Sequence, residues 1–293
     1  MATGGTARTV VLRDGTALWT SVSGSGLPVL LCHGGPGLWD YLGSLAALLD
    51  DRYTVVRFDQ RGCGRSGGGE PFTIAQAADD LDQVRAAYGF DRCAVIGHSW
   101  GAELVLRYAA HQPDRVNAVG YLAGIGAGDD FHERYVAARD QHLGGDLVRW
   151  QELRARARTA DEEREFCLLQ WRPDFSAANA AEHARALWDT RPEGTEVNAA
   201  ANEQLWADRD TEHLLELALR VQCPVLMLFG SDDPRPWDVT TSLFDALPRA
   251  ERVVLDDAGH APWTEQPDTV RKLLGEFLGA ARAESTGRNV EGR

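Results

Sequence analysis

The chain has 293 residues, of which 44% are hydrophobic and 25% are charged, with a formal net charge of −14 at pH 7. This composition excludes disordered and fibrous classes, and the length suits one large domain or a domain with an insertion. The negative charge argues against a nucleic-acid partner, and no apolar run of the sequence approaches the roughly 20 residues that a membrane helix needs.

Lysine and cysteine usage narrow the chemistry further. Lys272 is the only lysine, and it stands in an Arg-Lys-Leu-Leu context, which disfavours phosphate-loop, Ser-x-x-Lys and Schiff-base mechanisms. The five cysteines are odd in number and form no Cys-x-x-Cys pair. The chain also starts without a basic segment followed by an apolar one. We therefore expect reduced thiols and a cytoplasmic location.

The first third of the chain alternates strand and helix signals. The dipeptide Asp14-Gly15 between two such segments predicts a β-hairpin, and Thr73 with Gln76 has the spacing of a helix capping box. The predicted elements are, in chain order, strands at 9–12, 17–22 and 28–32, a helix at 39–49, a strand at 53–58, a helix at 73–88, a strand at 93–96, a helix after position 99 and a strand at 116–122. This βαβα order predicts an α/β fold with a mostly parallel sheet.

The pattern changes from about residue 127 to residue 220, where Arg, Glu and Ala dominate and no clear strand signal is found. We interpret this part as a helical cap insertion. Sheet signals then resume, with a strand at 224–229, a helix at 239–246, a strand at 252–255 and a closing helix at 264–278. The predicted organisation is an α/β core in two parts, residues 1–126 and 221–293, interrupted by a cap at 127–220.

The strongest local signal is Gly97-His98-Ser99-Trp100-Gly101, which lies between a predicted strand and a predicted helix. A Gly-x-Ser-x-Gly pentad in that position is typical of a nucleophile elbow, in which a sharp turn exposes the serine at the start of a helix. In such a turn the side chain of His98 is expected to point away from the reacting face.

A nucleophilic serine needs a base and an acid that orients the base. Of the eight histidines, His260 lies just past the last predicted strand, whereas five others lie in predicted helical segments. A candidate acid ends the preceding strand, in Ser231-Asp232-Asp233. The chain order serine, acid, histidine is that of the α/β-hydrolases.

Five motifs taken together resemble the proline iminopeptidase-like branch of the α/β-hydrolase superfamily. They are His33-Gly34-Gly35-Pro36-Gly37, Asp59-Gln60-Arg61-Gly62-Cys63-Gly64-Arg65-Ser66, the elbow, Gly230-x-x-Asp233 and Gly259-His260. The resemblance implies an eight-stranded, mostly parallel sheet with helices on both faces and an inserted cap. It also selects Asp233 over Asp232 as the acid.

The resemblance implies site residues and an activity as well. Carried over by position, the backbone N–H groups of Gly35 and Trp100 would form the oxyanion hole. The implied activity is that of a serine hydrolase that uses Ser99, Asp233 and His260 to cleave a small amide or ester, foremost by releasing an N-terminal residue. The expected substrate is a small molecule or a short peptide. We expect Trp39 and Trp263, beside the motifs, and Glu103, in the first turn of the nucleophile helix, to contribute to the substrate pocket.

Departures from the branch leave alternatives open. Those enzymes usually have a second glycine where His98 stands, and they hold the substrate amine near a Trp-Glu pair that the predicted cap lacks. The candidates for binding an amine are Glu162, Glu163 and Glu165. A carboxylesterase or lactonase acting on a small metabolite needs no amine site, and a non-hydrolytic or ligand-binding use of the fold is a third possibility.

Two partial motifs suggest cofactors and are interpreted otherwise. The Gly-x-Gly-x-x-Gly match at residues 62–67 runs into further glycines and not into a helix, so we expect a tight loop held by Asp59 and Arg65. His132-Glu133 begins like a zinc-protease motif, but position 136 is valine, so the second histidine ligand is missing. We therefore predict neither a metal nor a cofactor.

Overall fold

The computed structural model describes residues 5–128, 130–176 and 178–291. Its centre is an eight-stranded sheet in the order β1-β2-β4-β3-β5-β6-β7-β8. The strands are β1 (Thr6–Val11), β2 (Ala17–Ser23), β3 (Leu27–Cys32), β4 (Tyr53–Phe58), β5 (Cys93–His98), β6 (Val116–Leu122), β7 (Val225–Gly230) and β8 (Ala250–Leu255). Strands β1, β2 and β4 pair antiparallel, and the remaining neighbours pair parallel, which confirms the predicted mostly parallel sheet.

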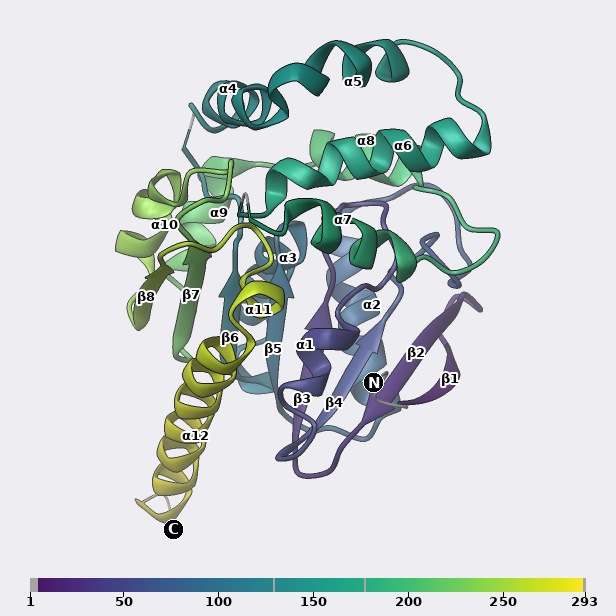
Figure 1. Cartoon of the computed structure of the whole chain (residues 1–293). Helices are drawn as coiled ribbons and strands as arrows, with labels where there is room; N and C mark the ends of the chain where they lie inside the picture. Colours follow the sequence, from purple (N-terminus) through teal and green to yellow (C-terminus); the bar gives the residue numbers. More distant parts are fainter. Residues whose placement is uncertain (1–4, 129, 177, 292–293) are drawn as a thin grey trace.

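Helices cover both faces of this sheet (Figure 1). The helices of the core are α1 (Gly43–Ala47), α2 (Ile74–Ala87), α3 (Trp100–His111), α10 (Thr241–Ala246), α11 (Pro262–Glu265) and α12 (Pro267–Glu291). Two short 3-10 helices, η1 (Pro113–Arg115) and η4 (Trp237–Thr240), accompany them. Within the described residues, no helix has both the length and the apolar character needed to cross a membrane.

The strand sequences explain why helices cover the sheet on both faces. Successive side chains of a strand point to opposite faces, and in β3 Leu30 and Cys32 join one hydrophobic core while Val29 and Leu31 join the other. Both sets are fully buried. Continuous apolar strands of this kind are typical of parallel sheets that are packed on both faces.

Between β6 and β7 the chain forms helices α4 to α9, which we call the cap. Its helices are α4 (Phe131–Leu143), α5 (Leu147–Arg154), α6 (Ala160–Trp171), α7 (Ala180–Asp189), α8 (Ala199–Ala207) and α9 (Thr211–Ala218), with the 3-10 turns η2 (Gly144–Asp146) and η3 (Arg172–Asp174). Figure 1 shows α4 to α7 at one end of the sheet, above the carboxyl ends of the parallel strands.

The predicted elements agree closely with the structure in the strands and less well at the first two helices. The predicted strands at 53–58 and 116–122 coincide with β4 and β6. The helix predicted at 39–49 is shorter, since only Gly43–Ala47 is helical and the residues before it make tertiary contacts. Thr73 caps α2 as predicted, accepting from the Gln76 N–H at 3.2 Å, but the Gln76 side chain bonds Asp80 instead of closing the capping box.

Candidate functional site

Ser99 lies on a strained turn between β5 and α3. Its backbone has φ 56° and ψ −122°, a positive φ that non-glycine residues rarely adopt. Flanking glycines make the turn possible: a Cβ at Gly97 would lie 2.0 Å from the Gly101 carbonyl oxygen, and one at Gly101 would lie 2.3 Å from the Cys32 carbonyl oxygen. The local sequence therefore forms a nucleophile elbow, and the serine lines a cavity.

Asp233 and His260 are brought together by the carboxyl ends of β7 and β8. His260 Nδ1 lies 2.6 Å from Asp233 Oδ2, and both side chains are buried. Burial and the nearby Arg235 hold the pKa of His260 well below its usual value, so the imidazole is neutral at pH 7. Burial raises the pKa of Asp233 to about 6, which still leaves it mostly ionised at pH 7. An ionised carboxylate beside a neutral imidazole can orient that ring as a proton acceptor.

The loop that carries Gly35 is held by the second motif. His33 donates from Nδ1 to the Gly34 carbonyl oxygen at 2.8 Å, and its Nε2 accepts from the Gln60 N–H at 3.1 Å. Asp59 is the anchor of the tight loop, where Arg65 Nε donates to its Oδ2 at 2.6 Å. Gly35, the first of the two expected oxyanion donors, lines the cavity beside Ser99. The second is Trp100, the first residue of α3, and its N–H has no carbonyl within the helix to bond.

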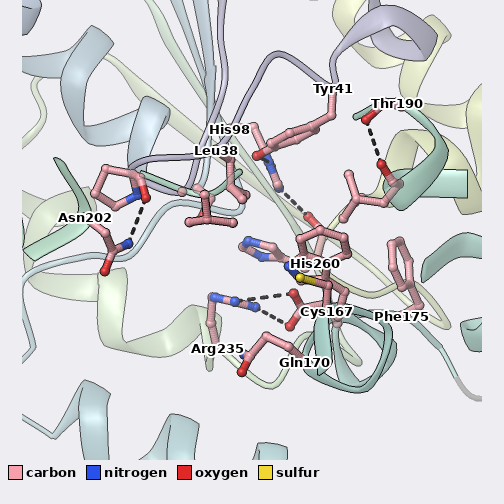
Figure 2. A pocket seen from close by; sticks show the side chains of 18 of the residues that line it. Leu38, Tyr41, His98, Cys167, Gln170, Phe175, Thr190, Asn202, Arg235 and His260 are labelled. Carbon is pink, nitrogen blue, oxygen red and sulfur yellow. Dashed lines mark hydrogen bonds and ion pairs between the residues drawn. The ribbon is translucent and has the colours of Figure 1, made fainter. Parts of the chain in front are cut away.

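His98 does not point away from the site as expected. Its ring centroid lies 4.5 Å from that of His260, and its Nε2 lies 2.8 Å from the His260 carbonyl oxygen (Figure 2). Its Nδ1 lies 2.7 Å from the Tyr41 hydroxyl, which also accepts from the Gly34 N–H at 2.9 Å. A carbonyl can only accept, so Nε2 carries the proton and the Tyr41 hydroxyl donates to Nδ1. This chain of bonds connects the loop of Gly35 to the loop of His260.

Removing the Tyr41 hydroxyl tests this connection. In Y41F the Gly34 N–H and the His98 Nδ1 lose their buried partner, which we expect to lower the free energy of unfolding by about 1–3 kcal/mol. The measurement is urea denaturation of the full chain. Y53F is the control, because the Tyr53 hydroxyl makes no hydrogen bond within the described residues, and a change within about 0.5 kcal/mol is expected there. Equal stability of Y41F and the unmodified chain would contradict the assigned network.

A cavity of about 1660 Å³ lies between these loops and the cap. Ser99, His260 and Gly35 line it from the core. The cap supplies mainly aromatic and aliphatic walls, which include Phe131, Tyr135, Phe166, Trp171, Phe175, Leu187 and Trp206. The volume exceeds the range of about 300–1,000 Å³ that is common for small-molecule sites. The cavity therefore has room for a substrate with a sizeable apolar part.

The structure places the three predicted pocket residues differently. Trp263 lines the cavity, and its indole N–H donates to Ser44 at 3.0 Å. Trp39 is not among the lining residues; it is buried behind the wall, edge-on to Trp171, with its N–H donating to Thr190 at 2.9 Å. Glu103 is also absent from the lining and fully buried beneath it.

Glu103 has a structural environment that explains its position. Its carboxylate pairs with Arg107 at 2.8 Å, one turn along α3, and with Arg209 at 2.6 Å. Arg209 lines the cavity and also donates to the Gly126 carbonyl. The acid thus fastens the chain after α8 to the core, and two cations on one buried carboxylate leave it no free charge for a substrate.

Truncating Glu103 is expected to destabilise the fold. E103A leaves Arg107 and Arg209 buried without their anion, and breaking a buried pair in this way costs about 3–5 kcal/mol. Urea denaturation measures the loss. The matched control is E165A, because Glu165 pairs with Arg149 at 2.7 Å on the cap surface and such exposed pairs are worth about 0–1 kcal/mol. A loss in E103A no larger than in E165A would contradict the buried-pair account.

The three acids suggested for amine binding are each paired with arginine. Glu162 bonds Arg156 and Glu165 bonds Arg149 on the outside of α6. Glu163 lines the cavity but pairs with Arg158 at 2.5 Å, which lines it as well. Among the residues that the structure describes, no group of three His, Cys, Asp or Glu side chains is placed to hold a metal ion.

An elbow serine, a buried aspartate–histidine pair and an inserted cap define the class to which this molecule belongs. The model of the alpha/beta hydrolase fold family matches residues 28–267, and the chain is a member of that family.

The names of individual relatives give different substrates. A protein of Escherichia coli O150:H5 named "Putative carbamate hydrolase RutD" is 30% identical over 255 residues, covering 84% of this chain and 89% of its own. The proline iminopeptidase of Heyndrickxia coagulans is 26% identical over 271 residues, covering 87% and 92%. The solved structure of a Mycobacterium smegmatis proline iminopeptidase superposes with a TM-score of 0.73 at 22% identity, covering 96% of this chain and 100% of that one. The first two relatives support hydrolysis as the activity, and the solved structure supports the fold.

Proposed function

We propose that the chain is a serine hydrolase that cleaves esters or uncharged amides of small substrates with an apolar acyl part. The observation that carries the proposal is that Ser99 and His260 line one largely apolar cavity while Asp233 bonds His260 from behind its ring, through Nδ1. The cytoplasm is the proposed location, which the free state of all five cysteines supports.

In the proposed mechanism Ser99 Oγ attacks the substrate carbonyl, and His260 Nε2 takes the proton. Asp233 holds the imidazole through Nδ1 and stabilises the imidazolium. The N–H groups of Gly35 and Trp100 would bind the oxyanion of the tetrahedral intermediate, a contribution of about 3–4 kcal/mol per donor. His260 then gives the proton to the leaving alcohol or amine. Water repeats the attack on the acyl-enzyme, restoring free Ser99 and releasing the acid.

The charges of the cavity favour an uncharged substrate. Of the acids that line it, Asp174 and Glu163 each pair with an arginine that lines it too, and Glu196 is exposed to solvent. A substrate ammonium group would therefore compete with the guanidinium that is already paired with Asp174 or with Glu163. Esters, carbamates and neutral amides need no such partner.

Release of an N-terminal residue is the second candidate. It is supported by the sequence resemblance and by the presence of Glu163 and Glu196 in the lining. Turnover of a prolyl arylamide, the same amide with a blocked N-terminus and a short-acyl nitrophenyl ester separates the two candidates. The first predicts that the ester is hydrolysed fastest and that blocking the amine leaves the amide rate unchanged. Fast release from the free prolyl amide and none from the blocked one would overturn it.

A further inference from the structure

The carboxylate of Asp233 is held on both of its oxygens. While Oδ2 faces His260, Oδ1 accepts from the backbone N–H of Arg235 at 2.9 Å and lies 3.4 Å from the Nη1 of the same residue. A carboxylate bonded on both oxygens has its plane fixed. The direction in which Asp233 presents Oδ2 to the imidazole therefore depends on where Arg235 lies.

Arg235 is in turn held by the cap. Its Nη1 donates to Asp174 Oδ1 at 2.7 Å, and its guanidinium carbon lies 4.7 Å from the centre of the Tyr135 ring on α4. The Arg235 side chain is only 17% exposed. Figure 2 shows Arg235 extending along the cavity wall below His260, with two dashed lines to its acidic partner. The guanidinium bridges an acid of the core and an acid of the cap.

The same stretch of the cap is bonded to the backbone around His260. The Asp174 carbonyl accepts from the His260 N–H at 2.6 Å. Glu265 completes the connection, since its two carboxylate oxygens accept from Ser176 N–H at 2.8 Å and from Gly259 N–H at 2.7 Å. The loop that carries the imidazole is thus attached to the cap at two successive backbone N–H groups, directly at His260 and through Glu265 at Gly259.

We propose that Asp174 and Arg235 are positioning residues through which the cap orients Asp233 and His260 for catalysis. Asp233 and His260 then reach their catalytic arrangement only when the cap turn at Asp174 is bonded to the core. This inference rests on the proposed serine-hydrolase function, and it assigns a catalytic consequence to a residue that lies outside the core sheet.

The charges around His260 provide a signature that a merely structural role would not produce. The charged and titratable groups that face it are Asp233 and Arg235 after β7, Asp174 from η3 and His98 at the end of β5, while Glu265 bonds the neighbouring Gly259. Arg235 lowers the pKa of His260 and Asp174 raises it. Neutralising Arg235 should therefore move the acid limb of activity to higher pH, and neutralising Asp174 should move it to lower pH.

The test is the pH dependence of Ser99 inactivation by a fluorophosphonate in the full chain, compared with kcat/KM for a short-acyl nitrophenyl ester. The variants are R235Q, R235K, D174N and the double variant D174N/R235Q. E165Q is the matched control, because it removes an acid from an arginine pair of the cap that faces solvent. Urea denaturation of each variant establishes that it folds.

We expect R235Q and D174N to lower the plateau rate by about 10²-fold, as a misplacement of about 1 Å does. The acid limbs of R235Q and D174N should move in opposite directions, and R235K should restore the limb of the unmodified chain. The double variant should lose less of the plateau rate than the product of the two single losses. E165Q should match the unmodified chain in both quantities. If R235Q and D174N fold but their acid limbs do not shift or their plateau rates do not fall, the positioning role is overturned. The proposed serine-hydrolase function would not be affected by that result. If the unmodified chain is not labelled at Ser99, the proposed function fails and this inference fails with it.

Discussion

Replacing Ser99 with alanine is expected to lower kcat/KM for ester hydrolysis by about 10⁶-fold, because the acyl-enzyme route is lost entirely. The small residual rate would come from the oxyanion donors and from substrate binding. The measurement is steady-state turnover of a short-acyl nitrophenyl ester by the purified variant. The fold should survive, since alanine removes one oxygen and keeps the positive φ that Ser99 already tolerates.

S242A is the control for this variant, because Ser242 is exposed on α10. Its rate should equal that of the unmodified chain. An S99A variant that keeps more than about one hundredth of the activity would contradict the assignment of the nucleophile, whatever the substrate proves to be.

Replacing Asp233 with asparagine is expected to reduce kcat by about 10⁴-fold. An asparagine has nearly the same shape, but its amide can place an N–H against Nδ1 of His260 and so hold the imidazole in the wrong tautomer. The proton of Ser99 then has no acceptor. The pH profile checks the same step: the acid limb of kcat/KM should lie below 6.5, because burial and Arg235 lower the pKa of His260 from that value.

The neighbouring acid supplies a matched control for D233N. Asp232 carries the same charge one position earlier, but its Oδ1 accepts from the Ser231 hydroxyl at 2.9 Å and not from His260. D232N should keep its activity within about twofold. If D232N were the impaired variant and D233N the active one, the acid would be Asp232 and the observed pairing with His260 would have no catalytic meaning.

Much of this architecture could be predicted from the sequence because parallel strands leave a strong local signal. Segments such as 53–58 and 116–122 are short apolar runs bounded by turn residues, and they need no tertiary information to be recognised. The elbow is equally local, since two glycines and a serine directly follow a strand. The sequence-predicted Ser99 and His260 both line one cavity, and Asp233 bonds His260.

The parts that sequence reasoning missed are contacts between distant segments. His98 was expected to point away, yet its two ring nitrogens find Tyr41, 57 residues earlier, and the His260 carbonyl, 162 residues later. Asp174 and Arg235 are 61 residues apart, and no periodicity links them. The one available signal was the position of Arg235 itself, two residues after the predicted acid.

Trp39 and Glu103 show the converse error. Their closeness to the motifs along the chain suggested the pocket, but side-chain direction decides which residues reach a cavity. Trp39 is 1% exposed behind Trp171, and Glu103 pairs with Arg107 of α3 and with Arg209 after α8. Residues that lie close to a motif along the chain can point away from the cavity. The packing of the cap decides which of them line it.

Covalent labelling shows whether Ser99 is an activated nucleophile. The full chain is incubated with a fluorophosphonate, digested and analysed by mass spectrometry. We expect one adduct per chain, on the peptide that contains Ser99. Labelling should be abolished in S99A and strongly slowed in H260A. Absence of an adduct on Ser99, or an equal labelling rate in H260A, would contradict this expectation.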